Sequence, residues 1–328
     1  MKICYLLQNG KGKFYRYGQY LPFFTKKNVD LSVVQLKKNI FIRFKSLYKA
    51  SLSDIVIVRR KLLLPWESIF LGLRPCKVIF DFDDAIFFKS SEPYYSFSRK
   101  IKFIAMMKAS DAVIAGNSYL KSLAEKYTVP DKIYILLTPI DLSKYRKKDY
   151  SIRTSEITLG WIGSKSTLKY LKELIPVFNK LGEKYKDLKL KIVGNSFFDC
   201  EELKVEKKEW NYDKEVDDLV SFDIGLMPLD DTPWSRGKCS FKLIQYVAVG
   251  IPGVCSPVGM NADVIENNKN GLWATTLDEW EKQLSILIEN PSLREEMGSA
   301  AYKKAFLYDQ AYVFEKFYKI ICDTLESK

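Results

Sequence analysis

The 328-residue sequence contains no histidine. This absence excludes catalysis by a Ser-His-Asp or Cys-His arrangement, and it excludes a histidine-ligated metal site. Any general base must be a carboxylate, a lysine or the substrate itself. Cysteine is also sparse. The six cysteines lie far apart without a C-x-x-C pair, so neither a zinc ribbon nor a disulfide framework is indicated, and we expect reduced thiols in a cytoplasmic protein.

Long apolar runs are absent as well. No run reaches the roughly 18 residues that a membrane-spanning helix needs. The first residues, MKICYLL, continue into polar sequence without a cleavage site, so we expect a buried strand there. With 47% apolar and 28% charged residues, the composition is that of a globular protein, and the length suits two domains.

Positive charge is concentrated in the first half of the chain. Residues 1–150 carry 28 Lys and Arg against 12 Asp and Glu, a net charge of +16. The remaining residues carry 24 against 28, a net charge of −4. A basic half of this kind needs an anionic partner or surface, such as nucleic acid, phospholipid headgroups or a phosphate-bearing substrate.

The first half alternates short apolar runs with amphipathic stretches, which is typical of an open β-α sheet. Candidate strands are Lys2–Leu7, Asp30–Val34, Asp54–Val58, Lys77–Phe80, Ala112–Ala115 and Ile133–Leu137. The loop after the first strand lacks the G-x-G-x-x-G spacing of a dinucleotide site, but it lies at the carboxyl end of a strand, where open sheets bind ligands. Arg16 is the candidate ligand-binding residue there, with a solvated loop arginine as the alternative.

Two predicted helices of this half, residues 36–50 and 94–108, combine an apolar stripe with several Lys and Arg. In the first helix the stripe consists of Leu36, Ile40, Phe44, Leu47 and Tyr48. Such helices can lie on an anionic bilayer surface. Alternatively the stripe packs on the sheet, as in most α/β proteins, and a packed apolar face is compatible with a basic face toward lipid.

Residues 223–261 carry the strongest chemical signal. A short apolar strand leads into the polar loop LDDTPWSRGKCS, and helical spacing returns at FKLIQYVAV. This order places backbone N–H groups and the positive helix end beside the loop. Arg236, Lys238 and Lys242 add positive charge, and Gly237 lets the backbone approach a ligand. The pattern predicts a site for a dianion such as a nucleotide diphosphate; a surface connection with solvated lysines is the alternative.

In this stretch, WSRGKCSFKLIQYVAVGIP and SPVGMN resemble the donor-binding motif of bacterial glycosyltransferases of family 4. The resemblance extends over nearly the whole chain. It implies the α/β class and the GT-B fold, with two Rossmann-like domains facing a central cleft. We expect an acceptor-binding domain over residues 1–150, a nucleotide-sugar-binding domain over 151–305, and a helix over 306–328 that crosses back to the first domain. The polar segment 146–156 is expected to link the domains.

The segment KVIFDFDDAIFF (77–88) places three carboxylates at the carboxyl end of a predicted strand. As a D-x-D pair, Asp81 and Asp83 could chelate a divalent cation under a sugar nucleotide, as in GT-A glycosyltransferases. The nucleophile loop of haloacid-dehalogenase phosphatases fits less well. The best resemblance is to FDxDDA-type segments of family 4, which implies that Asp83, with Asp84, orients substrate hydroxyls. A cap on the next helix is the structural alternative.

The resemblance also implies a phosphate loop at the start of the second domain. There a predicted strand ends at Gly163, and a helix is expected to begin near Thr167. Backbone N–H groups at such a helix start can bind phosphate. Family members usually place an Arg and a Lys here. Ser164 stands in place of the Arg, and Lys165 or Lys169 can serve as the Lys, so phosphate contact is expected to move to Arg236 and Lys238.

Three further residues are assigned from the same comparison. The turn at Glu209 and Trp210 is expected to contact the nucleotide base, with packing of the Trp side chain as the alternative. Asn117 is expected to begin a helix as its N-cap, on the acceptor side of the cleft.

The Glu-x₇-Glu signature of family 4 falls on Gly237 and Gln245. In the family the first glutamate touches the donor sugar and the second touches the ribose. Gln245 can still hydrogen-bond a ribose hydroxyl, and Cys239 and Ser240 complete the donor-binding loop. The missing first glutamate leaves open a non-catalytic homologue that binds a sugar nucleotide.

The residues and the resemblance together predict a retaining glycosyltransferase of the hexosyltransferase class (EC 2.4) that needs neither a cofactor nor a metal. Arg236 and Lys238 would stabilise charge on the leaving diphosphate. The acceptor is expected to be a glycan or a lipid-linked sugar in cell-surface polysaccharide synthesis, with the enzyme cytoplasmic or peripheral at the inner face of the membrane. A metal-dependent GT-A-like transferase is the rival. Nucleic acid is not expected as a partner, because the basic residues form no recognised motif.

Overall fold

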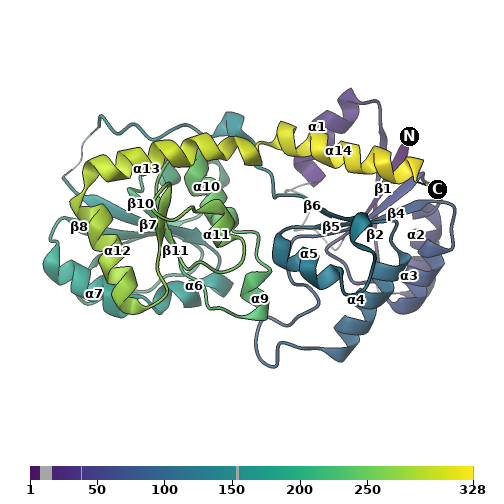
Figure 1. Ribbon diagram of the computed structural model, residues 1–328, viewed down its shortest axis with the longest axis horizontal. Coiled ribbons are helices and arrows are strands. Elements are labelled where there is room, and N and C mark those ends of the chain that lie inside the picture. Colours follow the sequence, from purple (N-terminus) through teal and green to yellow (C-terminus); the bar gives the residue numbers. More distant parts are fainter. Residues whose placement is uncertain (8–16, 38, 153–154, 328) are drawn as a thin grey trace. The chain divides into compact units, whose positions relative to one another are not determined.

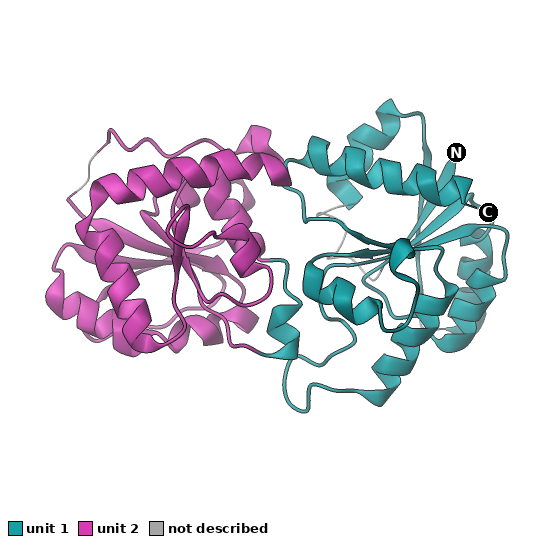
Figure 2. Cartoon of the chain, in the orientation of Figure 1, with its two compact units in different colours: residues 1–140, 232–239, 309–328 teal, residues 141–231, 240–308 magenta. Residues whose placement is uncertain are grey.

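The protein is described by a computed structural model covering residues 1–7, 17–37, 39–152 and 155–327. The chain forms two compact units (Figure 2). Unit 1 contains residues 1–140, 232–239 and 309–328, and unit 2 contains residues 141–231 and 240–308. Each unit is built on a six-stranded sheet with helices on both faces (Figure 1).

The sheet of unit 1 has the strand order β2-β1-β3-β4-β5-β6, and neighbouring strands are parallel. Its strands are β1 (Lys2–Leu7), β2 (Asp30–Gln35), β3 (Ile55–Arg59), β4 (Lys77–Phe82), β5 (Ala112–Ala115) and β6 (Ile133–Ile135). All six strands expected in the first half are therefore present, with small shifts at their ends. They form because apolar runs of good β-formers are covered on both faces, and every residue of β3 and β5 is buried.

Helices cover both faces of this sheet. They are α1 (Gln19–Lys26), α2 (Ile40–Ala50), α3 (Pro65–Gly72), α4 (Phe97–Ala109), α5 (Ser118–Ala124), the single turn α9 (Pro233–Arg236) and α14 (Gln310–Glu326). Side chains of α1 and α14 pack on one face, and side chains of α2 to α5 pack on the other. Phe314 and Phe317 of α14 are buried, and the ring centre of Phe314 lies 5.0 Å from that of Phe24 in α1.

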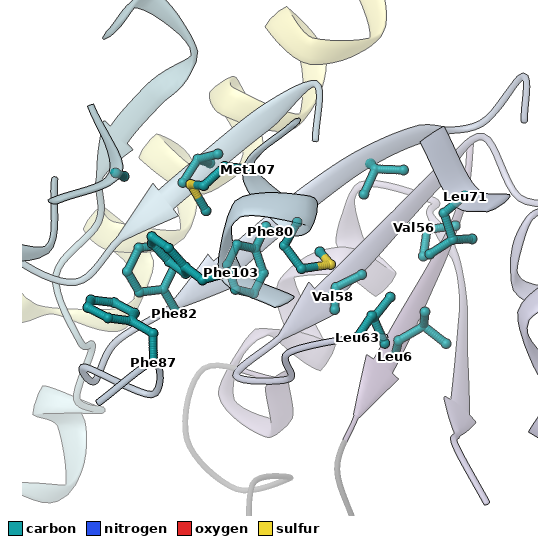
Figure 3. Packing of buried hydrophobic residues seen from close by; sticks show 14 of the residues in the cluster. Leu6, Val56, Val58, Leu63, Leu71, Phe80, Phe82, Phe87, Phe103 and Met107 are labelled. Atoms are coloured by element: carbon teal, nitrogen blue, oxygen red, sulfur yellow. The ribbon is translucent and has the colours of Figure 1, made fainter. Parts of the chain in front are cut away.

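The second face contains a cluster of aromatic rings beside β4. Figure 3 shows Phe82, Phe87 and Phe103 close together, and the ring centre of Phe103 lies 4.2 Å from that of Phe87 and 5.5 Å from that of Phe82. Burying a large apolar side chain contributes roughly 1.5–3 kcal/mol. This packing therefore fixes the end of β4, where the carboxylates predicted from the sequence are located.

The sheet of unit 2 has the strand order β12-β11-β10-β7-β8-β9, again with parallel neighbours. Its strands are β7 (Ile157–Gly163), β8 (Leu188–Gly194), β9 (Lys204–Glu209), β10 (Ile224–Met227), β11 (Gly253–Cys255) and β12 (Gly271–Trp273). The edge strand β9, with the sequence KVEKKE, is rich in charge, which discourages pairing with another chain. The helices are α6 (Lys165–Lys172), α7 (Ile175–Lys184), α8 (Glu215–Val220), α10 (Phe241–Val249), α11 (Asn261–Val264), α12 (Leu277–Glu289) and α13 (Pro291–Lys304).

The α/β class with two Rossmann-like halves is thus confirmed. The chain passes from unit 1 to unit 2 between residues 140 and 141, before the linker expected at residues 146–156. Arg146 pairs with Asp217 at 2.7 Å, and the Tyr150 hydroxyl donates to the carbonyl of Gly250 at 3.0 Å, so this part of the segment is held on unit 2. Throughout the described ranges, no helix has both the length and the apolar character to cross a membrane.

Candidate active site

The carboxylates at the carboxyl end of β4 meet two arginines at the end of β3. The parallel register places Arg59 opposite Asp81. Arg59 Nη1 lies 2.7 Å from Asp81 Oδ2, and its Nη2 lies 2.9 Å from Asp83 Oδ2. Arg60 pairs with Asp83, Nε to Oδ1 at 3.1 Å, and with Asp84. Two guanidinium groups therefore offset most of the negative charge of the three predicted carboxylates.

Burial and the neighbouring charges shift the pKa values of this network. Burial alone would lower the pKa of Arg59, but the carboxylates of Asp83 and Asp81 raise that pKa above its ordinary value. Removal from water raises the pKa of Asp84 to about 6, with Arg60 acting against the shift and the Asp83 carboxylate adding to it. Asp84 therefore changes its charge near neutral pH, unlike an ordinary aspartate.

The segment 232–239, which includes half of the predicted donor motif, belongs to unit 1. We call it the strap. The amide of Asn117 holds it, donating from Nδ2 to the carbonyls of Arg236 at 3.3 Å and Lys238 at 3.1 Å. The thiol of Cys239 donates to the carbonyl of Asp83. The same Asn117 caps α5, accepting from the N–H of Leu120 at 2.8 Å, as the sequence predicts.

Glycine at position 237 follows from the close approach of the strap to β4. A Cβ atom placed on Gly237 would lie 2.5 Å from the Cβ and 2.9 Å from the backbone nitrogen of Ala85. A glutamate there, as in the family signature, would need the strap to move away. The structure thus brings together Asp83, Asp84, Asn117 and the strap residues within unit 1. Close packing against Ala85 explains why position 237 is a glycine.

In unit 2, the second candidate site forms at the carboxyl end of β7. The side chain of Lys242 passes over Gly163, where a Cβ would lie 2.5 Å from Lys242 Cε. Its Nζ donates to Thr167 Oγ1 at 3.1 Å and lies 4.8 Å from the ring centre of Trp161. Thr167 is in the first turn of α6, and that turn contains no acidic residue. A lysine and a positive helix end therefore lie together, which favours an anion.

Two details correct the predicted phosphate loop. Helix α6 begins at Lys165, with Ser164 as its N-cap, rather than near Thr167. The N–H of Lys165 donates to Asn195 Oδ1 at 3.0 Å, so this backbone group is already occupied by a side chain from the end of β8. The preceding Ser164 hydroxyl lies 2.9 Å from that of Ser166.

The start of α10 lies in the same unit. Ser240, its N-cap, is buried in the left-handed region with φ of 51°, and its hydroxyl lies 2.6 Å from Asn261 Oδ1. Asn261 in turn donates to the carbonyls of Met227 at 3.4 Å and Ser256 at 2.9 Å. The side chain of Ser240 therefore fixes the beginning of α10, whose first turn also contains no acidic residue.

Predicted ribose and base residues are joined by one hydrogen-bond chain. Gln245 Nε2 lies 3.5 Å from the Tyr145 hydroxyl, which donates to Glu215 Oε1 at 3.2 Å. Glu215 accepts from Trp210 Nε1 at 2.7 Å on its other oxygen. Trp210 is 47% exposed, and the neighbouring Glu209 is exposed at the end of β9.

The sequence did not identify every residue of the site, and one predicted residue lies outside the part of the chain that the structure describes. Arg59 and Arg60 were missed, although two arginines ending a buried strand were a usable signal. No sequence pattern indicated Tyr145 or Glu215, because only the fold brings these residues close to Gln245. Arg16 lies outside the described residues. No group of three or more Cys, Asp or Glu side chains in the described ranges is arranged to hold a metal ion.

These two sheets with their flanking helices define the GT-B fold. The chain is similar to HepE of Anabaena, solved in complex with UDP, with 14% identity, a TM-score of 0.75, and coverage of 98% of this chain and 100% of that one. It is also similar to sucrose-phosphate synthase of Thermosynechococcus elongatus, with 10% identity, a TM-score of 0.77 and 98% coverage of each chain. For a glycosyltransferase of Rickettsia africae, the identity is 14%, the TM-score 0.77 and the coverage 100% and 99%.

Residues 236–304 match the family model described as "Glycosyl transferases group 1". No curated protein sequence matches the chain. The match begins at Arg236 in the strap and includes the whole of α10, so it covers most of the motif that the sequence singled out. The family match and the fold together support a glycosyltransferase. The two sheets also exclude the single-domain GT-A architecture that we considered as a rival.

Proposed function

We propose that this chain transfers a sugar from a nucleotide-diphosphate donor to a glycan or lipid-linked acceptor, with retention of anomeric configuration and without a metal ion. The proposal rests on the placement of Lys242 at the positive end of α6. Lys242 itself belongs to the segment that matches group 1 glycosyltransferases. HepE, which is similar in fold, has been solved with UDP-glucose. A donor of this class would supply the anion that the site favours.

Donor binding would use both helix starts of unit 2. The diphosphate would lie at the first turns of α6 and α10, with Lys242 between them and Lys165 nearby. The base would stack on Trp210, and Gln245 would hydrogen-bond the ribose. The chain of hydrogen bonds through Tyr145 and Glu215 fixes both side chains before the donor arrives, which reduces the entropy lost on binding.

Transfer itself would depend on charge, with the substrate rather than a side chain acting as the base, and such a mechanism needs no histidine. The leaving diphosphate would accept the acceptor's proton as the new bond forms on the same face of the sugar. Arg236 and Lys238 would stabilise the charge that develops on that phosphate. Asp83 and Asp84, at the end of β4, would orient hydroxyl groups of the acceptor or the sugar.

The donor is identified by thermal shift with UDP-, GDP-, ADP- and dTDP-sugars, because a ligand that binds the folded state raises Tm by mass action. We expect one nucleotide class to raise Tm and to be consumed when an acceptor glycan is added. The Arg236→Ala/Lys238→Ala variant should keep most of the Tm shift and lose turnover. Normal turnover in that variant would remove the proposed role of these cations.

The alternative is a non-catalytic homologue, which the glycine at position 237 first suggested. A donor that raises Tm, but is neither hydrolysed nor transferred with a broad panel of acceptors, would support this alternative. If none of the four nucleotide classes changes Tm, the proposal of a sugar-nucleotide site fails.

A further inference from the structure

Three helices of unit 1, α2, α3 and α4, lie side by side on one face of the sheet (Figure 1). The ring centre of Phe44 in α2 lies 5.2 Å from that of Phe70 in α3. Ser68 of α3 donates to the sulfur of Met106 in α4 at 3.3 Å. The three helices therefore form one continuous layer, and their outer sides form one surface, which we call the outer helix face.

The outer helix face is unusually apolar. Nine large apolar side chains on these helices are exposed: Ile40, Phe41, Ile42, Phe44, Tyr48, Trp66, Ile69, Phe97 and Ile101. Leu73, which ends α3, is exposed as well. The exposed fraction is 82% for Phe41 and 80% for both Leu73 and Phe97. Single exposed apolar residues are ordinary, but ten of them on one layer of three adjoining helices indicate an interaction surface.

The spacing shows that the exposure is built into the helices. Trp66, Ile69 and Leu73 follow one another at three and four residues and form an outward stripe on α3. Ser68 and Leu71, on its opposite side, are buried against the sheet layer. Helix α3 thus presents apolar side chains to water, whereas a surface helix normally presents polar residues there.

Basic residues surround these apolar side chains, and acidic ones are nearly absent. The three helices carry seven Lys and Arg against a single Glu. That Glu67 is buried and paired with Arg43, Nη2 to Oε2 at 2.8 Å, so it presents no negative charge. In unit 2, by contrast, α12 carries four acidic residues and one lysine.

We propose that the outer helix face binds the surface of an anionic lipid bilayer. Aromatic and branched side chains would enter the boundary between headgroups and acyl chains, and Lys45, Lys49 and Lys100 would meet the lipid phosphates. A second copy of the chain fits less well, because two such basic faces would repel each other. The inference deepens the proposed function, since a lipid-linked acceptor lies in a bilayer, but membrane binding itself needs neither donor nor acceptor.

The test is flotation with vesicles of phosphatidylcholine alone or mixed with phosphatidylglycerol, at low and high salt and without nucleotide. We expect binding to the anionic vesicles only, weakened by salt. Phe41→Ser/Leu73→Ser should lower the partition coefficient by about tenfold or more, because two exposed apolar side chains are lost. Lys45→Glu/Lys49→Glu should lower it by a similar factor through charge.

Matched controls come from unit 2. Leu277→Ser/Phe306→Ser removes exposed apolar side chains there, and Lys282→Glu/Lys303→Glu reverses exposed lysines there. Both should float like the unchanged protein. The proposal is overturned if the unchanged protein stays with the unbound fraction on anionic vesicles at low salt, or if the controls lose binding equally. It is also overturned if size-exclusion chromatography shows a dimer that Phe41→Ser/Leu73→Ser dissociates while vesicle binding is unaffected.

Thermal shift with the nucleotide sugar separates this proposal from the proposed function. The Phe41→Ser/Leu73→Ser variant should keep the Tm of the unchanged protein and the same nucleotide-induced shift, because the altered side chains are exposed and lie in unit 1. Vesicle binding without any nucleotide-induced shift would support the outer helix face and reject the donor site.

Discussion

The carboxyl ends of β4 in unit 1 and of β7 in unit 2 each carry candidate site residues, yet they handle charge in opposite ways. At the end of β4, the buried Asp81 and Asp83 are paired with the buried Arg59, and Asp83 is also paired with the more exposed Arg60. At the end of β7, Lys242 lies beside the first turn of α6, where no acidic residue is present. The first arrangement is balanced by the protein itself. The second favours an anion from solution.

This difference in charge pairing predicts which substitutions should change the stability of the fold and which should change ligand binding. Removing a partner from a buried, balanced network leaves an uncompensated charge and destabilises the fold. Removing a cation from a site built for a ligand mainly weakens the ligand. Both considerations apply to the strap. It carries Arg236 and Lys238, which are proposed to act on the ligand, and it packs beside the network of buried ion pairs.

The largest effect is expected for Arg59→Met. Two buried carboxylates would lose the guanidinium of Arg59, although Asp83 keeps its pair with Arg60, and we expect the free energy of unfolding to fall by about 3–5 kcal/mol. Urea denaturation followed by circular dichroism measures it. The matched control is Arg146→Met, which breaks an exposed pair with Asp217 and should cost no more than about 1 kcal/mol. Equal effects in both variants would contradict the contrast between buried and exposed pairs.

The next effect concerns the ligand site of unit 2. Lys242→Ala should weaken binding of a nucleoside diphosphate by about 1.5–3 kcal/mol, since a charge-assisted hydrogen bond to phosphate is lost. Isothermal titration with UDP and with uridine separates the phosphate contribution from that of the base. Uridine binding should be unchanged. A similar loss for uridine would show that Lys242 supports the fold of the site rather than the phosphate.

A smaller effect is expected at the strap. Gly237→Ala places a methyl group against Ala85, and Asn117→Asp keeps the cap on α5 while removing the two donors to the strap. Each should destabilise the strap by about 1–3 kcal/mol. Because trypsin cleaves after Arg and Lys, brief digestion should cut after Arg236 and Lys238 faster in both variants. Asn117→Ser serves as a comparison. Unchanged cleavage rates in Gly237→Ala and Asn117→Asp would contradict the role of Gly237 and Asn117.

The smallest effect is the pH dependence from Asp84. Its pKa of about 6 in the folded protein lies above its ordinary value of 3.8, so the folded state binds more protons than the unfolded state between these values. The stability contributed by Asp84 is therefore present at low pH and is lost as pH rises through about 6. Asp84→Asn should flatten this decline between pH 4 and 6, as measured by urea denaturation at several pH values. An unchanged slope would show that Asp84 titrates normally.

The sequence by itself predicted the six strands of the first half and the helix start at Asn117 correctly. The strands were readable because an apolar run covered on both faces is a local pattern, as IVIVR of β3 shows. The cap at Asn117 was readable because a side chain that bonds its own helix start acts over three residues. The lack of histidine limited the chemistry without any structure.

Only the tertiary structure decided which residues meet. Arg59 and Asp81 are 22 residues apart in sequence and become neighbours through parallel strand register. The strap packs on unit 1 because Ala85 and Asn117 are there, although its sequence continues into a helix of unit 2. Among Ile40, Phe44, Leu47 and Tyr48 of the predicted stripe, only Leu47 is buried. Periodicity shows that a helix has an apolar side, but contacts between distant segments decide whether that side faces the sheet or the solvent.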